Sequence, residues 1–314
     1  MKKYLSLLCL ILVSSTYVYA QQIIFTPQWT PQSQFAGYYA AMENGYYSDA
    51  GLDVSIVHPS KSYGSVDMLL DGSSNIITCE LIQALTVCDR SIKLVNLMQT
   101  TQHSTLVLLA RNENLKQMSQ LARRRIGTWK AGFSEIPTMI DKEKNLGIDW
   151  IKSINPLNLY ISGAIDAALV KSYNEQILFS MSGVTPGSVI EFSKIGYDFP
   201  EDGLYVTEDF YKKYPEQCRK FAQASRKGWE WVRNNRSEAL DIVMKYVKTE
   251  NIATNIYNQK FMLDTILEVQ EDTAGENPSY NLNKEVFNSL NSMLLDHGYI
   301  TKPIEYNRFT GGKL

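Results

Sequence analysis

The segment from Gln28 to Tyr39 gathers side chains that are suited to hold a small organic ligand. It reads Gln-Trp-Thr-Pro-Gln-Ser-Gln-Phe-Ala-Gly-Tyr-Tyr and follows a short apolar run, residues 23–26, that we predict to be a strand. A helix is expected over residues 34–44. Ligands of parallel α/β sheets bind at the carboxyl ends of strands, so aromatic side chains at this point predict a pocket with aromatic walls.

Two interpretations apply to the aromatic residues of this segment. Phe35 and Tyr39 are four apart, which is the spacing of a helix face turned toward a core. Trp29 and Tyr38 lie off that stripe and are therefore expected to contact a ligand. Phe35 stays a candidate contact as well, because the same helix begins at the predicted pocket.

A second group of candidates follows a later apolar run. Tyr173, Asn174 and Glu175 come just after a predicted strand over residues 164–170. The carboxylate of Glu175 can accept two parallel hydrogen bonds from an amidine-like edge, such as the ring nitrogen and amine of an aminopyrimidine. A solvated surface glutamate is the alternative interpretation of this residue.

Trp129 ends another predicted strand, residues 125–129, and is followed by Lys130, Ala131 and Gly132. The indole can form a wall of a pocket, and Gly132 can let the backbone approach a ligand. A tryptophan at the end of a strand also serves packing alone, so both interpretations stay open. We include Trp129 among the candidate ligand contacts.

Signatures of catalysis and of cofactor binding are absent from the sequence. There is no Gly-x-x-x-x-Gly-Lys loop, no Gly-x-Ser-x-Gly elbow and no Gly-x-Gly-x-x-Gly motif. The cysteines after the first twenty residues lack Cys-x-x-Cys spacing and the histidines are scattered, so no metal site is expected. These residues are Cys79, Cys88, Cys218, His58, His103 and His297. We therefore expect a protein without a cofactor that is not an enzyme, and leave open whether two of the cysteines pair.

The composition is that of a globular protein preceded by a leader. The chain has 314 residues, 44% of them hydrophobic, with 31 basic and 33 acidic side chains. That length predicts about two domains, and the charge balance offers no basic surface for nucleic acid. Two lysines precede an apolar run, residues 5–13, that is too short to span a bilayer. We expect residues 1–20 to be a secretory signal peptide, cleaved after Ala20.

Strand and helix patterns alternate along the first half of the chain, which predicts an α/β fold with doubly wound parallel sheets. Two apolar runs, residues 104–110 and 203–207, are expected to cross between two such units as a hinge. Lobe 1 would then comprise residues 21–107 and 205–314. Lobe 2 would comprise residues 108–204.

Two finer expectations concern the second half of the chain. The apolar run over residues 177–181 is predicted to be a strand of lobe 2. The pattern from Glu208 onward is helical and should pack back on lobe 1. Its first long helix has an apolar stripe made of Cys218, Phe221, Ser225, Trp229 and Val232.

Motifs along the whole chain are similar to those of a known family. They are Gln28-Trp29-x-Pro31-Gln32-x-Gln34-Phe35-Ala36-Gly37-Tyr38-Tyr39, Gly45-Tyr46-Tyr47-x-x-x-Gly51-Leu52-Asp53-Val54, Met68-Leu69-x-x-Gly72, Ser162-Gly163-x-Ile165-Asp166-Ala167 and Tyr173-Asn174-Glu175. The sequence resembles the ABC-transporter solute-binding proteins of the thiamine-pyrimidine-precursor branch. The motif that begins at Gly45 is shared with neighbouring branches that bind sulfonates, whereas the Gln-Trp opening is more specific.

The resemblance implies a type II periplasmic binding protein, in which two α/β lobes close on a ligand about a two-strand hinge. It implies formylaminopyrimidine or hydroxymethylpyrimidine as ligand, held between aromatic rings such as Trp29 and Tyr38 and the carboxylate of Glu175. It further implies a monomer in the periplasm with an ABC permease as partner.

Three alternatives differ from this interpretation in ligand, activity or partner. A sulfonate, taurine or nitrate binder has the same fold but needs hydrogen-bond donors for an oxyanion, and Glu175 would repel an anion. A eukaryotic branch of the family synthesises the pyrimidine and carries a cysteine cluster that is absent from this sequence. A sensor that docks on a membrane histidine kinase would use the same closed form, so this alternative stays open.

Overall fold

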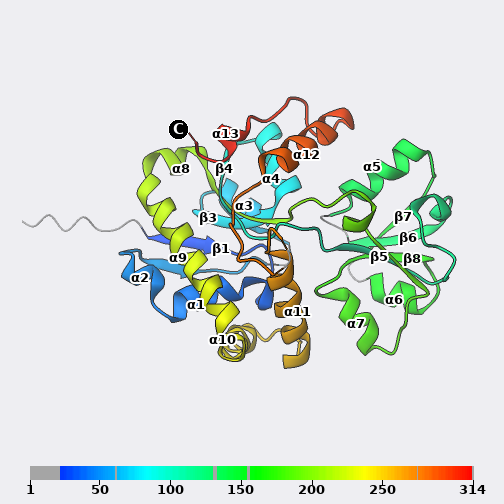
Figure 1. Ribbon diagram of the computed structural model, residues 1–314, viewed down its shortest axis with the longest axis horizontal. Coiled ribbons are helices and arrows are strands. Elements are labelled where there is room, and N and C mark those ends of the chain that lie inside the picture. Colours follow the sequence, from blue (N-terminus) through cyan, green and yellow to red (C-terminus); the bar gives the residue numbers. More distant parts are fainter. Residues whose placement is uncertain (1–21, 61, 130–132, 154–155, 274, 313–314) are drawn as a thin grey trace, which may run out of the picture.

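The computed structural model describes residues 22–60, 62–129, 133–153, 156–273 and 275–312. They form two α/β lobes, with two stretches of chain crossing between them (Figure 1). The predicted signal peptide, residues 1–20, and the predicted backbone approach at Gly132 lie outside the described residues. Within the described part of the chain, no helix is long and apolar enough to cross a membrane.

Lobe 1 is built on a five-stranded sheet with the order β2-β1-β3-β10-β4. Strand β10 runs antiparallel to both of its neighbours, whereas β1 is parallel to β2 and β3. The strands are β1 (Ile23–Thr26), β2 (Val54–Ile56), β3 (Ile76–Glu80), β4 (Leu94–Gln99) and β10 (Asp202–Thr207). The helices between them are η1 (Ser33–Phe35), α1 (Ala36–Glu43), α2 (Tyr46–Asp49), α3 (Ser65–Leu70) and α4 (Leu81–Arg90).

Lobe 2 repeats this topology with the order β7-β6-β8-β5-β9. Its antiparallel strand is β5, which pairs with β8 and β9. The strands are β5 (Leu106–Ala110), β6 (Arg125–Trp129), β7 (Asp149–Ser153), β8 (Ala167–Lys171) and β9 (Ser188–Glu191). The helices are η2 (Met118–Leu121), α5 (Glu135–Lys144), α6 (Pro156–Ile161), α7 (Glu175–Met181) and η3 (Ser193–Ile195).

The chain crosses between the lobes in segments 100–105 and 192–201, just before β5 and β10. The lobe boundaries expected at 107/108 and 204/205 fall inside these two strands. Sheet pairing explains the difference, because each strand has a partner on both sides and lies wholly within one sheet. At the crossing, side-chain oxygens of Thr101 and Glu201 accept hydrogen bonds from buried backbone N–H groups.

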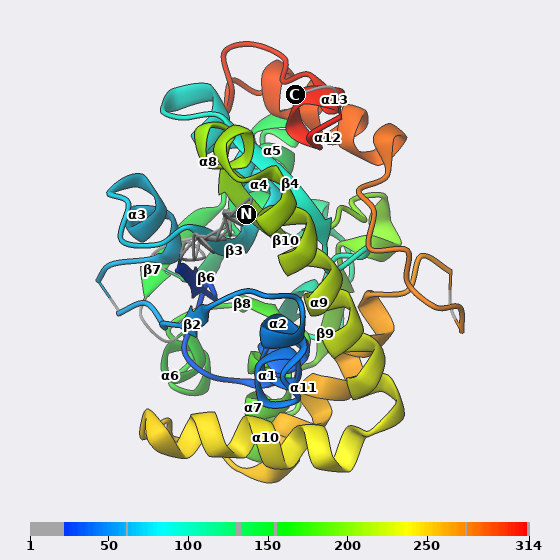
Figure 2. The same ribbon diagram turned by 90° about the vertical axis from the view of Figure 1, so that its left-hand side faces the viewer.

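The helices after β10 return to lobe 1, as the sequence predicts. In Figure 2, α9 runs along α1 and α10 crosses beneath it. The predicted stripe of α9 is buried along its whole length. These helices are α8 (Glu208–Lys213), α9 (Pro215–Asn234), α10 (Arg236–Thr249), α11 (Ile256–Val269), α12 (Lys284–Asp296) and α13 (Tyr306–Phe309).

The expectation of a strand over residues 177–181 is wrong, because these residues belong to helix α7. The period of such a short apolar run cannot separate a strand from a helix. Two local features favour the helix: Glu175 places a carboxylate in its first turn, and Gly183 has the positive φ of 71° that follows many helix ends. Phe179 is the residue that this helix buries.

The contact between α1 and α9 depends on glycine. A Cβ atom at Gly228 would lie 2.0 Å from the carbonyl oxygen of Gly37 and 2.9 Å from Cβ of Ala41. Neither neighbour can rotate away, so the two helices approach this closely only without a side chain at this position.

We therefore predict that Gly228→Ala lowers the free energy of unfolding by at least about 2 kcal/mol, because the helices must separate. Chemical denaturation measures the change. The matched control is Glu230→Ala, an exposed position on the same helix, for which a change within about 0.5 kcal/mol is expected. An alanine at position 228 that leaves stability unchanged would contradict the helix contact.

Candidate ligand-binding site

Trp29 and Trp129, two of the predicted ligand contacts, meet between the lobes. Trp29 lies in the loop after β1, and Trp129 is the last residue of β6, which occupies the same place in the sheet of lobe 2. Their ring centroids are 6.4 Å apart and the rings stand edge to face at 80°. Trp29 is 48% exposed, so the indole that lobe 1 contributes is still open to a ligand.

His58 holds the loop that carries Trp29. Its Nδ1 lies 2.6 Å from the carbonyl oxygen of Trp29, and its Nε2 lies 2.9 Å from the hydroxyl of Tyr39. A carbonyl only accepts, so Nδ1 carries the proton and Nε2 accepts from Tyr39. Burial lowers the pKa of His58, which favours this neutral form. The loop is thereby fixed to helix α1.

Phe35 and Tyr38 lie in the core of lobe 1. Both are 1% exposed. The ring of Tyr38 packs between Phe25 and Trp229, with centroid distances of 4.8 and 5.9 Å, and its hydroxyl lies 2.8 Å from Oγ1 of Thr100. The expectation that Tyr38 lies off the buried stripe is wrong. Helices α9 and α10 both pack on α1, so most of its circumference is covered.

Tyr173, Asn174 and Glu175 reach from lobe 2 toward lobe 1. Tyr173 is 8% exposed and packs with the core of lobe 1. Oε1 of Glu175 accepts a hydrogen bond from Nδ2 of Asn174 at 2.8 Å, and Oε2 accepts one from the backbone N–H of Lys171 at 3.0 Å. Burial raises the pKa of the Glu175 carboxyl. Each oxygen keeps a second lone pair that can accept from a ligand.

Tyr173 lies in a negatively charged environment. Burial raises the pKa of this phenol well above its usual value, and nearby negative charges raise it further. These charges belong to Asp202, Glu201, Glu175 and Glu80. We call Trp29, Trp129, Tyr173, Asn174, Glu175, Lys171 and the carboxylates of Glu80, Glu201 and Asp202 the interlobe site.

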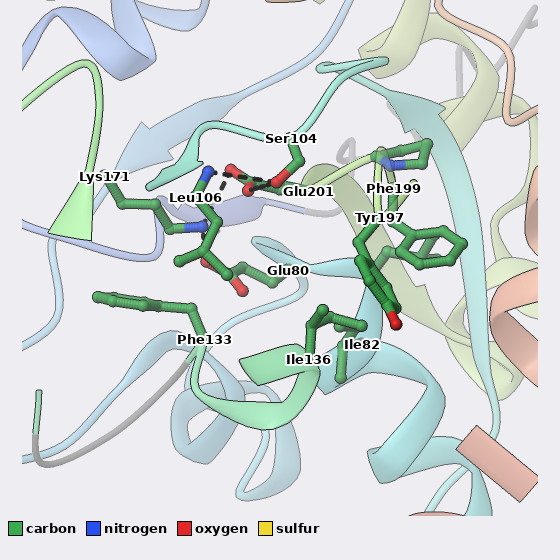
Figure 3. A pocket seen from close by; sticks show the side chains of 12 residues that line it. Glu80, Ile82, Ser104, Leu106, Phe133, Ile136, Lys171, Tyr197, Phe199 and Glu201 are labelled. Carbon is green, nitrogen blue, oxygen red and sulfur yellow. Dashed lines mark hydrogen bonds and ion pairs between the residues drawn. The ribbon is translucent and has the colours of Figure 1, made fainter. Parts of the chain in front are cut away.

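Lys171 joins the lobes through two ion pairs. Its Nζ lies 2.8 Å from Oε1 of Glu80, at the end of β3, and 2.9 Å from Oε2 of Glu201, in the second crossing segment (Figure 3). Its side chain is 6% exposed, and the ammonium lies 4.9 Å from the ring centroid of Phe133. Glu201 also accepts from Oγ of Ser104 in the first crossing segment.

Asp202 ties the loop after β1 to the crossing segments. Oδ1 accepts from Nε2 of Gln28 at 2.8 Å, and Oδ2 accepts from Nε2 of Gln34 at 2.6 Å. The backbone N–H of Asp202 donates to Oγ1 of Thr101 at 2.9 Å. Burial raises the pKa of this carboxyl, while the two amide donors oppose the shift.

Two cavities differ sharply in size and place. The one in Figure 3 lies beside Lys171, holds about 20 Å³, which is room for one water molecule, and touches none of the seven predicted ligand contacts among the described residues. A hollow of about 720 Å³ lies on lobe 1 at the opposite edge of its sheet, near Ser74 and Lys93. There Glu208 already pairs with Lys212 and Arg308. Neither cavity is formed by the two indoles.

The structure thus brings together five of the seven predicted contacts, Trp29, Trp129, Tyr173, Asn174 and Glu175, and places Phe35 and Tyr38 in the core. Sequence reasoning missed the charged residues of the site. Glu80 ends the apolar strand β3, at the edge of the sheet where ligands bind, and this position is a usable signal in the sequence. Glu201 and Asp202 gave no such signal, because they lie in the return crossing of the chain.

No metal site is found either. Among the described residues, no group of three or more histidine, cysteine, aspartate or glutamate side chains could hold a metal ion. Cys79, Cys88 and Cys218 carry free thiols.

Comparison with known proteins agrees with this architecture. The family model described as NMT1/THI5 like matches residues 32–239. The formylaminopyrimidine-binding protein of Halalkalibacterium halodurans is 22% identical over 291 residues, which cover 88% of this chain and 85% of that protein. The binding protein YtlA of Bacillus subtilis is 24% identical over 294 residues, which cover 89% of this chain and 85% of that protein.

Solved structures show the same fold at low sequence identity. The periplasmic aliphatic sulphonate-binding protein SsuA of Escherichia coli superposes with a TM-score of 0.65 and 12% identity, covering 94% of this chain and 97% of that chain. A ligand-binding component of an ABC-type import system from Staphylococcus aureus gives a TM-score of 0.64 and 10% identity, covering 92% and 96% of the two chains. The expected two-lobed fold is confirmed. The chain belongs to the NMT1/THI5-like family and has the fold of the periplasmic binding proteins.

Proposed function

We propose that the protein captures an aminopyrimidine precursor of thiamine and delivers it to an ABC permease. The observation that carries this proposal is the excess of carboxylates in the interlobe site. The ammonium of Lys171 pairs with Glu80 and Glu201. Glu175 and Asp202 accept hydrogen bonds from amide and backbone N–H groups. Such a site favours a ligand that is rich in N–H donors or positively charged.

The aromatic residues suit the flat ring of such a ligand. Trp29 and Trp129 come from opposite lobes, so a ring that contacts both indoles would hold the lobes together. Each offset contact adds about 0.5 to 1.5 kcal/mol beyond the buried area. The carboxylate of Glu175 can accept a hydrogen bond from the amine and, when the ring nitrogen of the pyrimidine is protonated, a second one from its N–H. The relative named for formylaminopyrimidine supports the same ligand class.

The rival ligand class is a sulfonate, by analogy with SsuA. The similarity to that structure concerns the fold. A sulfonate would bring a negative charge next to buried carboxylates, and burial makes this repulsion stronger than it is in water. The electrostatics of the interlobe site therefore favour the pyrimidine.

The first prediction from this proposal concerns the class of ligand. Hydroxymethylpyrimidine or formylaminopyrimidine at 100 times its dissociation constant should stabilise the protein by about 2.7 kcal/mol, which raises the midpoint of thermal unfolding by several degrees. The protein is first unfolded and refolded to remove any co-purified solute. Taurine, an alkanesulfonate and nitrate should leave the midpoint unchanged, and a response to these anions alone would refute the proposal.

The second prediction concerns the two main contacts. Glu175→Gln keeps the shape but replaces one acceptor oxygen with a donor, so the affinity for the pyrimidine should fall by about 10- to 100-fold. Trp29→Ala should also weaken binding, whereas Trp29→Phe should retain most of it. Calorimetric titration measures these affinities, with Glu113→Gln, an exposed glutamate of lobe 2, as control. Unchanged affinity in Glu175→Gln would exclude this carboxylate from the site.

The third prediction concerns pH. Burial raises the pKa of the Glu80 carboxyl to about 7, with Lys171 opposing and Glu201 and Asp202 adding to the shift. Between the ordinary glutamate pKa and about 7, the folded protein holds a proton that the unfolded chain has released. The contribution of Glu80 to stability therefore falls as pH rises through this range.

Glu80→Gln removes this titration. The stability of the variant relative to the wild-type protein should accordingly improve as the pH rises from about 5 to about 8, measured by denaturation at each pH. Glu113→Gln serves as the control and should show no such trend. A constant difference between wild-type protein and Glu80→Gln across the range would contradict the buried position of this carboxyl.

A further inference from the structure

Asp202 holds the side-chain amide of Gln28 in one orientation. A carboxylate oxygen accepts, so the amide must turn its Nε2 toward Oδ1 of Asp202, at 2.8 Å. The other oxygen, Oδ2, is occupied by the amide of Gln34 in the same way. The backbone of Gln28 is also anchored, since its N–H donates to Oγ1 of Thr78 at 2.8 Å.

The carbonyl oxygen of Gln28 consequently faces away from Asp202. This Oε1 is buried, and it has no hydrogen-bond partner within the part of the chain that the structure describes. Nε1 of Trp129, in lobe 2, is likewise buried without a partner among the described residues. A buried polar atom left unpaired costs about 1 to 3 kcal/mol, so two of them beside one aromatic pair require an explanation.

The two atoms come from opposite lobes of the interlobe site. Gln28 precedes Trp29, whose ring meets that of Trp129. Lobe 1 therefore contributes an unpaired acceptor to this site, and lobe 2 contributes an unpaired donor, among the residues that the structure describes. A ligand with an amine on one edge and an acceptor on another could donate to Oε1 of Gln28 and accept from Nε1 of Trp129.

We infer that Asp202 is a positioning residue: it makes Oε1 of Gln28 an acceptor for an N–H group of the ligand and so selects a ring amine over a ring carbonyl. The inference rests on the proposed function, because it assigns the ligand of the same site. An amine donates to Oε1, whereas a carbonyl at this position would face it oxygen to oxygen.

The exchange Asp202→Asn should reverse the amide of Gln28. Gln34 keeps its orientation, because its Oε1 accepts from Nε2 of Gln32 at 2.5 Å. The new asparagine must then turn its oxygen toward Gln34 and its Nδ2 toward Gln28. Gln28 can pair with this Nδ2 only through Oε1, which turns its own NH₂ group toward the ligand.

The test compares two probes by calorimetric titration: 4-amino-5-hydroxymethyl-2-methylpyrimidine and the analogue with a 4-oxo group in place of the amine. The wild-type protein should bind the amino compound at least about tenfold more tightly. In Asp202→Asn this preference should vanish or reverse. Asp198→Asn, the same exchange four residues earlier in the second crossing segment, should keep the wild-type ratio.

The outcomes separate this inference from the proposed function. A wild-type protein that prefers the amino compound, together with an unchanged ratio in Asp202→Asn, would overturn the inference and leave the proposed function in place. A wild-type protein that binds neither probe would overturn both. If thermal unfolding shows that Asp202→Asn is not folded, Gln28→Leu takes its place. It removes the acceptor while Glu175 remains, so the preference should shrink, and a preference as large as that of the wild-type protein would refute the inference.

Discussion

The interlobe site depends on the ion pairs that the buried ammonium of Lys171 makes with two carboxylates. Lys171 reaches from the end of β8 in lobe 2 to Glu80 in lobe 1 and to Glu201 in the second crossing segment. Removing such charges from water costs about as much as their attraction returns, so the pairs add little net stability. Their effect is to fix the position of the lobes, because separating the ion pairs would leave unpaired charges in a buried site. The ends of β3 and β8 are thereby held at the crossing segments.

In the proposed function, the same cluster decides which ligands the site can accept. One ammonium shared by two carboxylates leaves Glu175 and Asp202 to be balanced by amides and backbone N–H groups. Burial strengthens what remains of the negative field. The two indoles supply contact area but little preference between flat rings, so the carboxylates and the amide of Gln28 determine the choice among them.

The sequence predicts much of this architecture because its signals are local. The alternation of strands and helices indicates two α/β lobes, and the stripe of α9 indicates its buried face. Trp29 and Glu175 are predicted as ligand contacts because they come after apolar strands, where ligands bind in such sheets; the ligand role of both stays a prediction. The short run over residues 177–181 is predicted to be a strand but forms a helix, because its period fits either structure.

The remaining features arise from tertiary contacts that no local pattern contains. Tyr38 is buried because α9 and α10, almost two hundred residues later in the chain, cover the helix that carries it. Glu201 and Asp202 join the site because the chain returns from lobe 2 at that point. The role of Gln28 depends on Asp202, with which it pairs at a separation of 174 residues.

A crystal structure of the protein with hydroxymethylpyrimidine tests the central claim most directly. The proposal predicts the pyrimidine ring in contact with Trp29 and Trp129, with its amine edge on the carboxylate of Glu175. Density for the ligand in the hollow on lobe 1, near Ser74 and Lys93, or on the surface of either lobe, would contradict it.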